Sequence, residues 1–264
     1  MNGRPRTPAL LVAIGATTAV LAGCGSTDST GPSTSASPST TVTVATTSQP
    51  SVTTTSVAVA PSTDGFGSGF AGRAGDARNG SDWNIKIPRL VSGEPRVRDA
   101  FNTAMENDAD RLIADAKDAD QAVTITNGEL MPEEASRVVI AKTTLSGAMI
   151  TVGAVEGAAY PVQTVDTVVV EAGAGRQLSL DDIFTDPAAA RQTLAALAPA
   201  ADPTGRLQDA PVPADTLQQW IALDEGLHLY VPVIHALGDF VPVTVAWNDL
   251  VDQLNATGKI LFSP

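Results

Sequence analysis

The sequence predicts a single α+β domain, in which one long and two short helices pack a mostly antiparallel sheet, preceded by a disordered tether. Three observations support this fold class. Apolar residues recur at helical spacing over one long stretch, residues 94–119. Alternating segments rich in Val, Ile and Thr lie within residues 122–171 and 227–247. Residues 24–80 are instead dominated by Ser, Thr, Pro and Gly, a composition typical of disordered linkers. Strands that follow one another directly along the chain favour antiparallel pairing.

The folded part is expected to open with a short strand and then the longest helix. Trp83 to Ile87 alternate in polarity, and Pro88 is expected to end this strand. One side of the helix over 94–119 carries Val97, Phe101, Met105, Leu112 and Ile113. The opposite side is acidic. Because no Asp-x-Asp-x-Asp-Gly loop accompanies it, we interpret this side as a solvated surface rather than a cation site.

Four strands are predicted next, over residues 122–125, 137–144, 148–155 and 162–171. Ser146-Gly147 suits a tight hairpin between the second and third of them. Gly173-Ala174-Gly175 resembles part of a glycine-rich phosphate-binding motif. It is expected to be a turn, because it follows a strand without opening a helix.

The last part of the chain predicts two short helices and two strands. Asp186 and Pro187 supply an N-cap and a first-turn proline for a helix over 187–197. A proline-rich loop, residues 200–213, leads to a short helix over 214–220. Strands over 227–233 and 241–247 precede a final helical turn at 248–255.

The N-terminus has the pattern of a lipoprotein signal peptide. Arg4 and Arg6 precede an apolar stretch, residues 9–20, which leads into Leu21-Ala22-Gly23-Cys24. This stretch is shorter than the roughly 20 apolar residues of a membrane-spanning helix. Residues 1–23 are therefore predicted to be cleaved, leaving Cys24 lipidated, with palmitate among its acyl chains, on the extracytoplasmic face of the cell membrane. The alternative is an ordinary cleaved signal with a cysteine at this position.

These observations divide the chain into a signal peptide (1–23), a lipid-anchored disordered linker (24–80) and an α+β domain (81–264). The sequence holds a single cysteine. Once Cys24 carries lipid, no thiol remains for a disulfide, a nucleophile or a metal. About 185 residues are enough for one domain with a substantial core of its own.

Charge limits the partners that this protein can have. The chain carries a net charge of −13, and removing Arg4 and Arg6 with the signal peptide leaves −15. Nucleic-acid binding is not expected, because phosphates attract clustered Lys and Arg. Membrane attachment is expected through the lipid on Cys24 rather than through the surface of the domain. An acidic surface suits a cationic partner, or simply solubility.

No motif in the chain predicts catalysis, a cofactor or a metal site. The two histidines, His228 and His235, are outside any HExxH arrangement, and Pro232 separates them. The nearest string to a hydrolase elbow, Gly65-Phe66-Gly67-Ser68-Gly69, has its serine displaced by one position and lies in the expected linker. Asp181-Asp182 is interpreted as a helix cap.

The second half resembles a known exported domain. The resemblance rests on Tyr160-Pro161, the strand 164–171, the run Gly175-Arg176-Gln177-Leu178-Ser179-Leu180-Asp181-Asp182-Ile183-Phe184, residues 226–230 and residues 243–250. Together these are similar to the C-terminal extracytoplasmic domain of RsiV-type anti-sigma factors. That domain also occurs in PdaC-type cell-wall proteins and in secreted immunogenic proteins of mycobacteria. The resemblance implies a mixed α+β domain, over roughly residues 83–254, that binds or senses at the cell envelope.

The chain departs from this family in ways that affect function. Relatives often carry Gly-Ala-His-Pro, whereas this chain has Gly157-Ala158-Ala159-Tyr160-Pro161, so no role of that histidine is carried over. A cytoplasmic sigma-binding segment, a transmembrane helix and a deacetylase domain are not expected here either.

The leading hypothesis is a non-enzymatic, lipid-anchored envelope protein. By resemblance, its domain would bind a basic lysozyme-type protein or a cell-wall component. The alternative, an envelope hydrolase such as an esterase, predicts a histidine beside a serine and a carboxylate. A third possibility is a surface protein with a purely structural role.

Overall fold

The computed structural model describes residues 62–208 and 211–263. The predicted signal peptide, Cys24 and most of the predicted tether lie outside these residues. A six-stranded sheet forms the first layer, in the order β1-β2-β3-β7-β6, with β8 pairing β7 as well. Its strands are β1 (Gly67–Asp76), β2 (Asp82–Ser92), β3 (Val123–Asn127), β6 (Arg137–Ile140), β7 (Thr144–Val155) and β8 (Val162–Glu171). Only β2 and β3 run parallel in this sheet; its other pairs are antiparallel.

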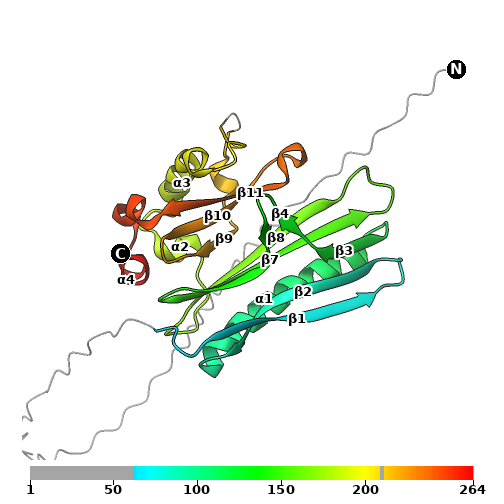
Figure 1. Ribbon diagram of the computed structural model, residues 1–264, viewed down its shortest axis with the longest axis horizontal. Helices are drawn as coiled ribbons and strands as arrows, with labels where there is room; N and C mark the ends of the chain where they lie inside the picture. The colour runs from blue at the N-terminus through cyan, green and yellow to red at the C-terminus, as the bar shows by residue number, and fades with distance from the viewer. Residues whose placement is uncertain (1–61, 209–210, 264) are drawn as a thin grey trace, which may run out of the picture. The chain divides into compact units, whose positions relative to one another are not determined.

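A second, three-stranded sheet runs in the order β11-β10-β9, and a small hairpin lies beside it (Figure 1). The sheet contains β9 (Trp220–Ala222), β10 (Gly226–Pro232) and β11 (Phe240–Ala246), and the hairpin contains β4 (Glu129–Leu130) and β5 (Glu134–Ala135). The helices are α1 (Pro95–Asp118), α2 (Leu180–Ile183), α3 (Pro187–Ala201) and α4 (Ala256–Phe262), with short 3₁₀ turns at Ala214–Thr216, His235–Leu237, Trp247–Asp249 and Val251–Gln253. The predicted α+β class with mostly antiparallel sheets is confirmed.

Helix α1 covers one face of the first sheet, as the helical spacing predicts. The Glu94 side chain caps it by accepting a hydrogen bond from the Val97 N–H. Phe101 and Met105 on its apolar side are fully buried against β2, β7 and β8. None of the helices within residues 62–208 and 211–263 is long and apolar enough to cross a membrane.

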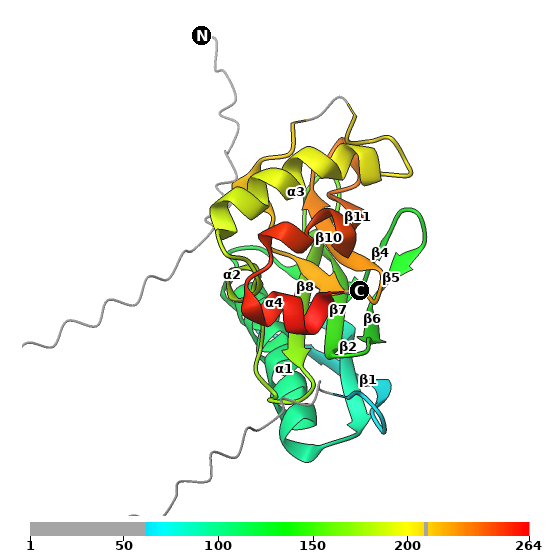
Figure 2. The same cartoon turned by 90° about the vertical axis from the view of Figure 1, so that its left-hand side faces the viewer.

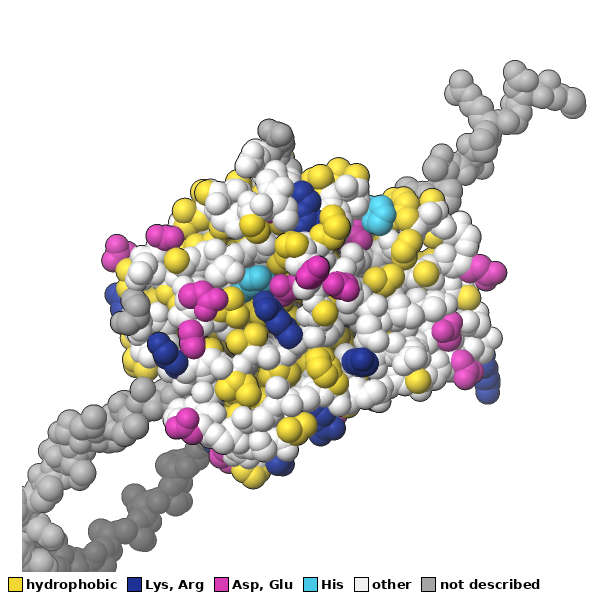
Figure 3. Space-filling model, viewed as in Figure 1, with side chains coloured by type: hydrophobic (Ala, Val, Ile, Leu, Met, Phe, Trp, Pro, Cys, Tyr) yellow, Lys and Arg dark blue, Asp and Glu magenta, His cyan; other side chains and the backbone are white. Residues whose placement is uncertain are grey.

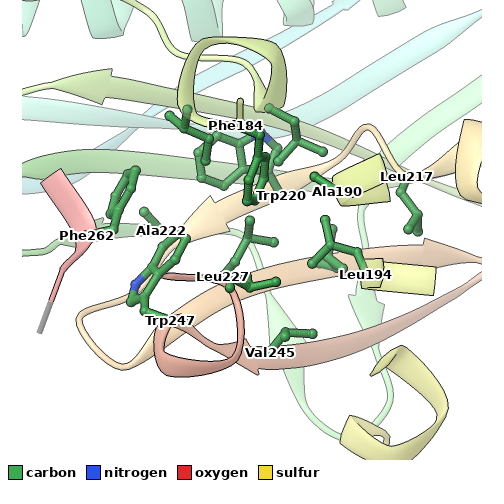
Figure 4. Packing of buried hydrophobic residues seen from close by; sticks show 14 of the residues in the cluster. Phe184, Ala190, Leu194, Leu217, Trp220, Ala222, Leu227, Val245, Trp247 and Phe262 are labelled. Atoms are coloured by element: carbon green, nitrogen blue, oxygen red, sulfur yellow. The ribbon is translucent and has the colours of Figure 1, made fainter. Parts of the chain in front are cut away.

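The second sheet lies between the first sheet and the remaining helices. One of its faces packs with α2, α3 and α4 around Trp220, Trp247 and Phe262 (Figures 2 and 4). Its other face contributes Tyr230 and Ile221 to a smaller core shared with β7 and β8. Strand β7 is consequently covered on both sides, and its first eight residues are buried.

The expected boundary at residue 81 is wrong in part, because β1 occupies residues that the composition assigns to the linker. Its ten residues, including Ser68, pair with β2 from Gly67↔Ser92 to Asp76↔Asp82. Glycine has low intrinsic strand preference, but a continuous ladder with a neighbouring strand overrides it. The folded part therefore includes residues 67–80.

Strand β2 continues past Pro88, where the sequence predicts its end. The N–H groups of Lys86 and Leu90 both point away from β1, toward Asn127 and Asn102. The nitrogen of Pro88 lies at the same edge, beyond the point where pairing with β3 stops at Asn84. No ladder hydrogen bond is required there, so the proline is tolerated.

The hairpin predicted at Ser146-Gly147 is wrong. Both residues lie inside β7, paired with Val169 and Val168 of β8. The turn after β6 instead closes with a hydrogen bond between the Ala141 N–H and the Thr144 carbonyl. A Cβ atom on Gly147 would lie 2.7 Å from the Phe101 ring, so this glycine allows α1 to approach the sheet.

Replacing Gly147 with valine is expected to lower the free energy of unfolding by about 1–3 kcal/mol, because the added methyl groups overpack the contact with α1. Urea unfolding of the purified domain would measure the effect. Gly72→Val is the matched control, because a Cβ at Gly72 meets no atom within 4 Å. Equal stability of the two variants would contradict the close approach of helix and strand.

The C-terminal predictions are correct in outline and wrong in three places. Helix α3 extends to Ala201, passing through Pro199. Residues 214–220, predicted as a helix, form a 3₁₀ turn and strand β9. The predicted turn at 248–255 is two 3₁₀ turns, followed by α4, which the sequence analysis missed.

Candidate functional site

A partly buried polar cluster joins the β4–β5 hairpin to the second sheet. One oxygen of Glu134, Oε1, lies 2.6 Å from the Tyr230 hydroxyl, 2.8 Å from the Arg137 guanidinium and 3.3 Å from His228 Nε2. The other ring nitrogen of His228 lies 2.8 Å from the Thr244 hydroxyl. Because His228 and Thr244 are cross-strand partners on β10 and β11, their side chains lie on the same face. We call these five residues the Glu134 cluster.

The cluster stabilises the ionised form of Glu134. Burial alone raises the pKa of this carboxyl, but His228, the Tyr230 hydroxyl and the charge of Arg137 offset burial and hold the pKa below its ordinary value of 4.5. The pKa of Tyr230 moves the other way. Burial, reinforced by the neighbouring carboxylate, raises it well above 10.0, so this phenol remains a hydrogen-bond donor at physiological pH.

The lowered pKa of Glu134 predicts a specific loss of stability in acid. Its contribution is complete well above pH 4.5, the value of the unfolded state, and is lost as the pH falls from there through the lower value of the folded state. The difference in unfolding free energy between the wild type and Glu134→Gln is therefore expected to shrink between about pH 6 and about pH 3. Denaturant titrations at several pH values would measure it. A difference independent of pH would contradict the pKa assignment.

Two features of the Glu134 cluster distinguish it from a hydrolase triad. The hydroxyl contacts Nδ1 of the histidine and the carboxylate lies nearest to Nε2, the reverse of the usual serine triad. The hydroxyl also belongs to a threonine within a strand, not to a serine on a sharp turn. The cluster connects β5 and β6 to β10 and β11.

A groove of about 590 Å³ lies between β8, the start of α3 and the segment leading to β9. Its size falls within the range of small-molecule sites. Neutral amide and hydroxyl side chains predominate among the polar groups that line it: Thr167, Gln177, Ser179, Gln192, Gln218 and Gln219. The charged lining residues are Arg191 and Asp215, and Arg191 pairs with Asp181. No residue of the Glu134 cluster lines this groove.

The edge of β8 that points away from β7 faces this groove through Thr167 and Val169, of which Thr167 is half-buried and Val169 is 2% exposed. The Thr167 N–H donates to Oε1 of Gln219, at 3.1 Å, and the Val169 carbonyl accepts from the Leu178 N–H, at 2.8 Å. In an antiparallel strand the N–H and C=O of one residue point to the same edge. The Thr167 carbonyl and the Val169 N–H therefore point to this same edge, away from β7. Neither has a hydrogen-bond partner among the described residues.

The structure places the two histidines in separate clusters. His228 belongs to the Glu134 cluster. His235 lies in a 3₁₀ turn, where its ring stacks on Tyr160 with centroids 3.9 Å apart. His235 Nδ1 lies 3.0 Å from Oδ1 of Asp239, whose other oxygen accepts a hydrogen bond from the Gln163 N–H.

Of the predicted pair Asp181-Asp182, Asp182 helps to cap α2 as the partner of the N-cap residue Ser179, whereas Asp181 pairs with Arg191. The Asp182 carboxylate accepts hydrogen bonds from the Ser179 N–H and hydroxyl. Gly173-Ala174-Gly175 forms a turn after β8, where the Gly175 N–H donates to the Glu171 carbonyl.

The acidic side of α1 is partly neutralised by arginines of the same chain. Arg111 lies 3.1 Å from Asp108 and 2.7 Å from the buried Asp166 of β8, and Arg73 pairs with Asp110. Burial raises the pKa of Asp166, and Arg111 opposes this shift. Within the described residues, no group of three or more His, Cys, Asp or Glu side chains could hold a metal ion.

Comparison with known proteins gives structural neighbours without an assigned activity. No family model matches this chain, and no curated protein matches it either. A DUF3298 family protein from Bacteroides fragilis has a similar structure, with a TM-score of 0.49 and 13% identity over 76% of this chain and 97% of its own. A DUF3298 family protein from Pseudomonas aeruginosa gives 0.48 and 10%, over 75% of this chain and 96% of its own. The RsiV-type resemblance remains a prediction.

Proposed function

We propose that this protein is a lipid-anchored cell-envelope protein whose domain binds a protein or wall component without chemically changing it. The groove beside β8 is the observation that carries the proposal. It combines a volume suited to a ligand with neutral amide and hydroxyl groups, which recognise polar ligands through hydrogen bonds. Its lining contains one carboxylate, Asp215, and no histidine. Acid–base catalysis usually needs a pair of such groups.

The anchor in this proposal is the lipid on Cys24, supported by the lipobox sequence. Metabolic labelling with a fatty acid, followed by mass spectrometry of the N-terminal peptide, tests it. Cys24→Ser is expected to abolish the label and to shift the protein out of the membrane fraction. An unlabelled wild-type N-terminus would contradict lipidation.

Binding is tested with residues 62–264 and two probes, isolated cell walls and a basic lysozyme. Co-sedimentation with walls, or calorimetric binding of lysozyme that persists from low to physiological salt, would support the proposal. Weak binding of lysozyme that disappears with added salt would indicate charge attraction alone. Failure to bind either probe would contradict the proposed function.

The alternative function is an esterase. The specific observation in its favour is the contact of His228 with both the Thr244 hydroxyl and Glu134. An ester-hydrolysis screen with the wild type and Thr244→Val tests it. We expect no turnover by either protein, whereas turnover lost only in Thr244→Val would favour the enzyme.

A further inference from the structure

We propose that the groove binds an extended, uncharged peptide segment of a protein partner, which pairs with the edge of β8. This inference rests on the proposed binding function and deepens it by naming the chemistry of the ligand. The argument comes from the main-chain groups at this edge, from the pairing already present beside it, and from the character of the lining.

The main chain offers two adjacent hydrogen-bonding groups. The Thr167 carbonyl and the Val169 N–H flank Val168 at the same edge of β8, and both lack a partner among the described residues. In an antiparallel segment, the two residues that flank the one opposite Val168 can make these bonds. One donates its N–H to the Thr167 carbonyl, and the carbonyl of the other accepts from the Val169 N–H. Peptides that add a strand to an exposed sheet edge gain affinity from hydrogen bonds of this kind.

A short piece of this chain already pairs with β8 in the same manner. Gln177 forms an isolated antiparallel bridge with Val170, supported by hydrogen bonds from Leu178 to Val169 and from Glu171 to Arg176. This pairing ends at Val169, where the groove begins. A bound peptide would therefore continue, along the same edge, an interaction that the fold has started.

On the other side of the two free groups, Gln219 prevents the pairing from extending further. Its side-chain oxygen accepts hydrogen bonds from the N–H and the hydroxyl of Thr167, at 3.1 and 2.9 Å. The accessible edge is thus short and bounded at both ends. It suits a specific local contact rather than the open-ended strand addition that leads to aggregation.

The lining selects for an uncharged segment. The buried side chains of Leu178, Leu180 and Trp220 contribute apolar surface, while glutamines are the most frequent polar residues around it. A glutamine amide can both donate to and accept from a peptide group. A charged side chain entering the groove would lose hydration without finding an unpaired opposite charge, apart from Asp215.

Ala188 and Ala189 provide a matched pair of variants. Both residues are exposed in the first turn of α3, and both N–H groups are held by Asp186, yet only Ala188 lines the groove. Ala188→Trp is expected to fill the groove, whereas Ala189→Trp places the same bulk outside it. Circular dichroism and thermal unfolding would verify that both variants keep the fold.

The test uses residues 25–264 and a blocked, uncharged hexapeptide rich in Thr and Val, with binding followed by fluorescence anisotropy of a labelled copy. Binding to the wild type and to Ala189→Trp, weakened at least about tenfold in Ala188→Trp, would support the proposal. N-methylation of successive peptide nitrogens should reduce binding sharply at one position, since it removes the N–H donated to Thr167.

Three results would overturn the inference. Equal binding by the two tryptophan variants would place the peptide elsewhere. If the peptide bound residues 62–264 but not residues 25–264, the tether of this chain would be the segment that occupies the groove. Capture of walls or lysozyme by wild-type protein that binds no peptide would leave the proposed function standing and refute the peptide ligand alone.

Discussion

Replacing Glu134 with alanine is expected to lower the free energy of unfolding by about 2–4 kcal/mol, because it removes the acceptor of the buried Tyr230 hydroxyl and the carboxylate that lies beside Arg137 and His228. The loss exceeds the hydrogen bond itself, since the Tyr230 hydroxyl would stay buried without a partner. Chemical denaturation at neutral pH would measure the loss.

Glu129→Ala is the control for this prediction. Glu129 lies on the partner strand of the same hairpin, is exposed, and makes no side-chain hydrogen bond among the described residues. Its replacement should change the unfolding free energy by no more than about 0.5 kcal/mol. If Glu134→Ala cost equally little, the cluster would not connect the hairpin to the second sheet.

Asn102→Ala is expected to destabilise the first layer by a similar amount, about 2–4 kcal/mol. The buried side-chain amide of Asn102 makes the two hydrogen bonds to β2 that a neighbouring strand would otherwise make. Its oxygen accepts from the Leu90 N–H at 2.8 Å, and its nitrogen donates to the Leu90 carbonyl at 3.0 Å. Alanine would leave both main-chain groups unpaired in a buried environment.

Thr103→Ala, at the neighbouring exposed position of α1, controls for helix propensity and should be neutral or slightly stabilising. Hydrogen exchange gives a second measurement. The Leu90 amide should be protected in the wild type and exchange faster in Asn102→Ala. Unchanged protection would contradict the role assigned to Asn102.

Local patterns predicted the elements whose stability is mainly local. The apolar spacing within residues 94–119 predicts α1, and the Val and Thr residues of 162–171 predict β8. The glycine-rich β1 could not be recognised, because only its pairing with β2 makes it a strand. The start of β7 was missed since a strand covered on both faces loses the alternation on which the prediction depends.

The candidate site was not predictable, for a similar reason. The groove brings together four separate stretches, around Thr167, Ser179, Arg191 and Gln218, and none of them carries a recognisable motif. Glu134 meets Tyr230 across 96 positions of sequence. The available indications were a glutamine-rich stretch, Gln218-Gln219, before a strand, and a histidine on that sheet. Neither the glutamines nor the histidine indicates, without the fold, which residues lie beside it.

The most direct test of this account is co-sedimentation of residues 62–264 with isolated cell walls, and calorimetric titration with lysozyme, for the wild type, Ala188→Trp and Ala189→Trp. We predict that the wild type and Ala189→Trp bind one of these probes equally at physiological salt, and that Ala188→Trp does not. Equal binding by all three proteins, or binding by none, would contradict a binding function located in the groove beside β8.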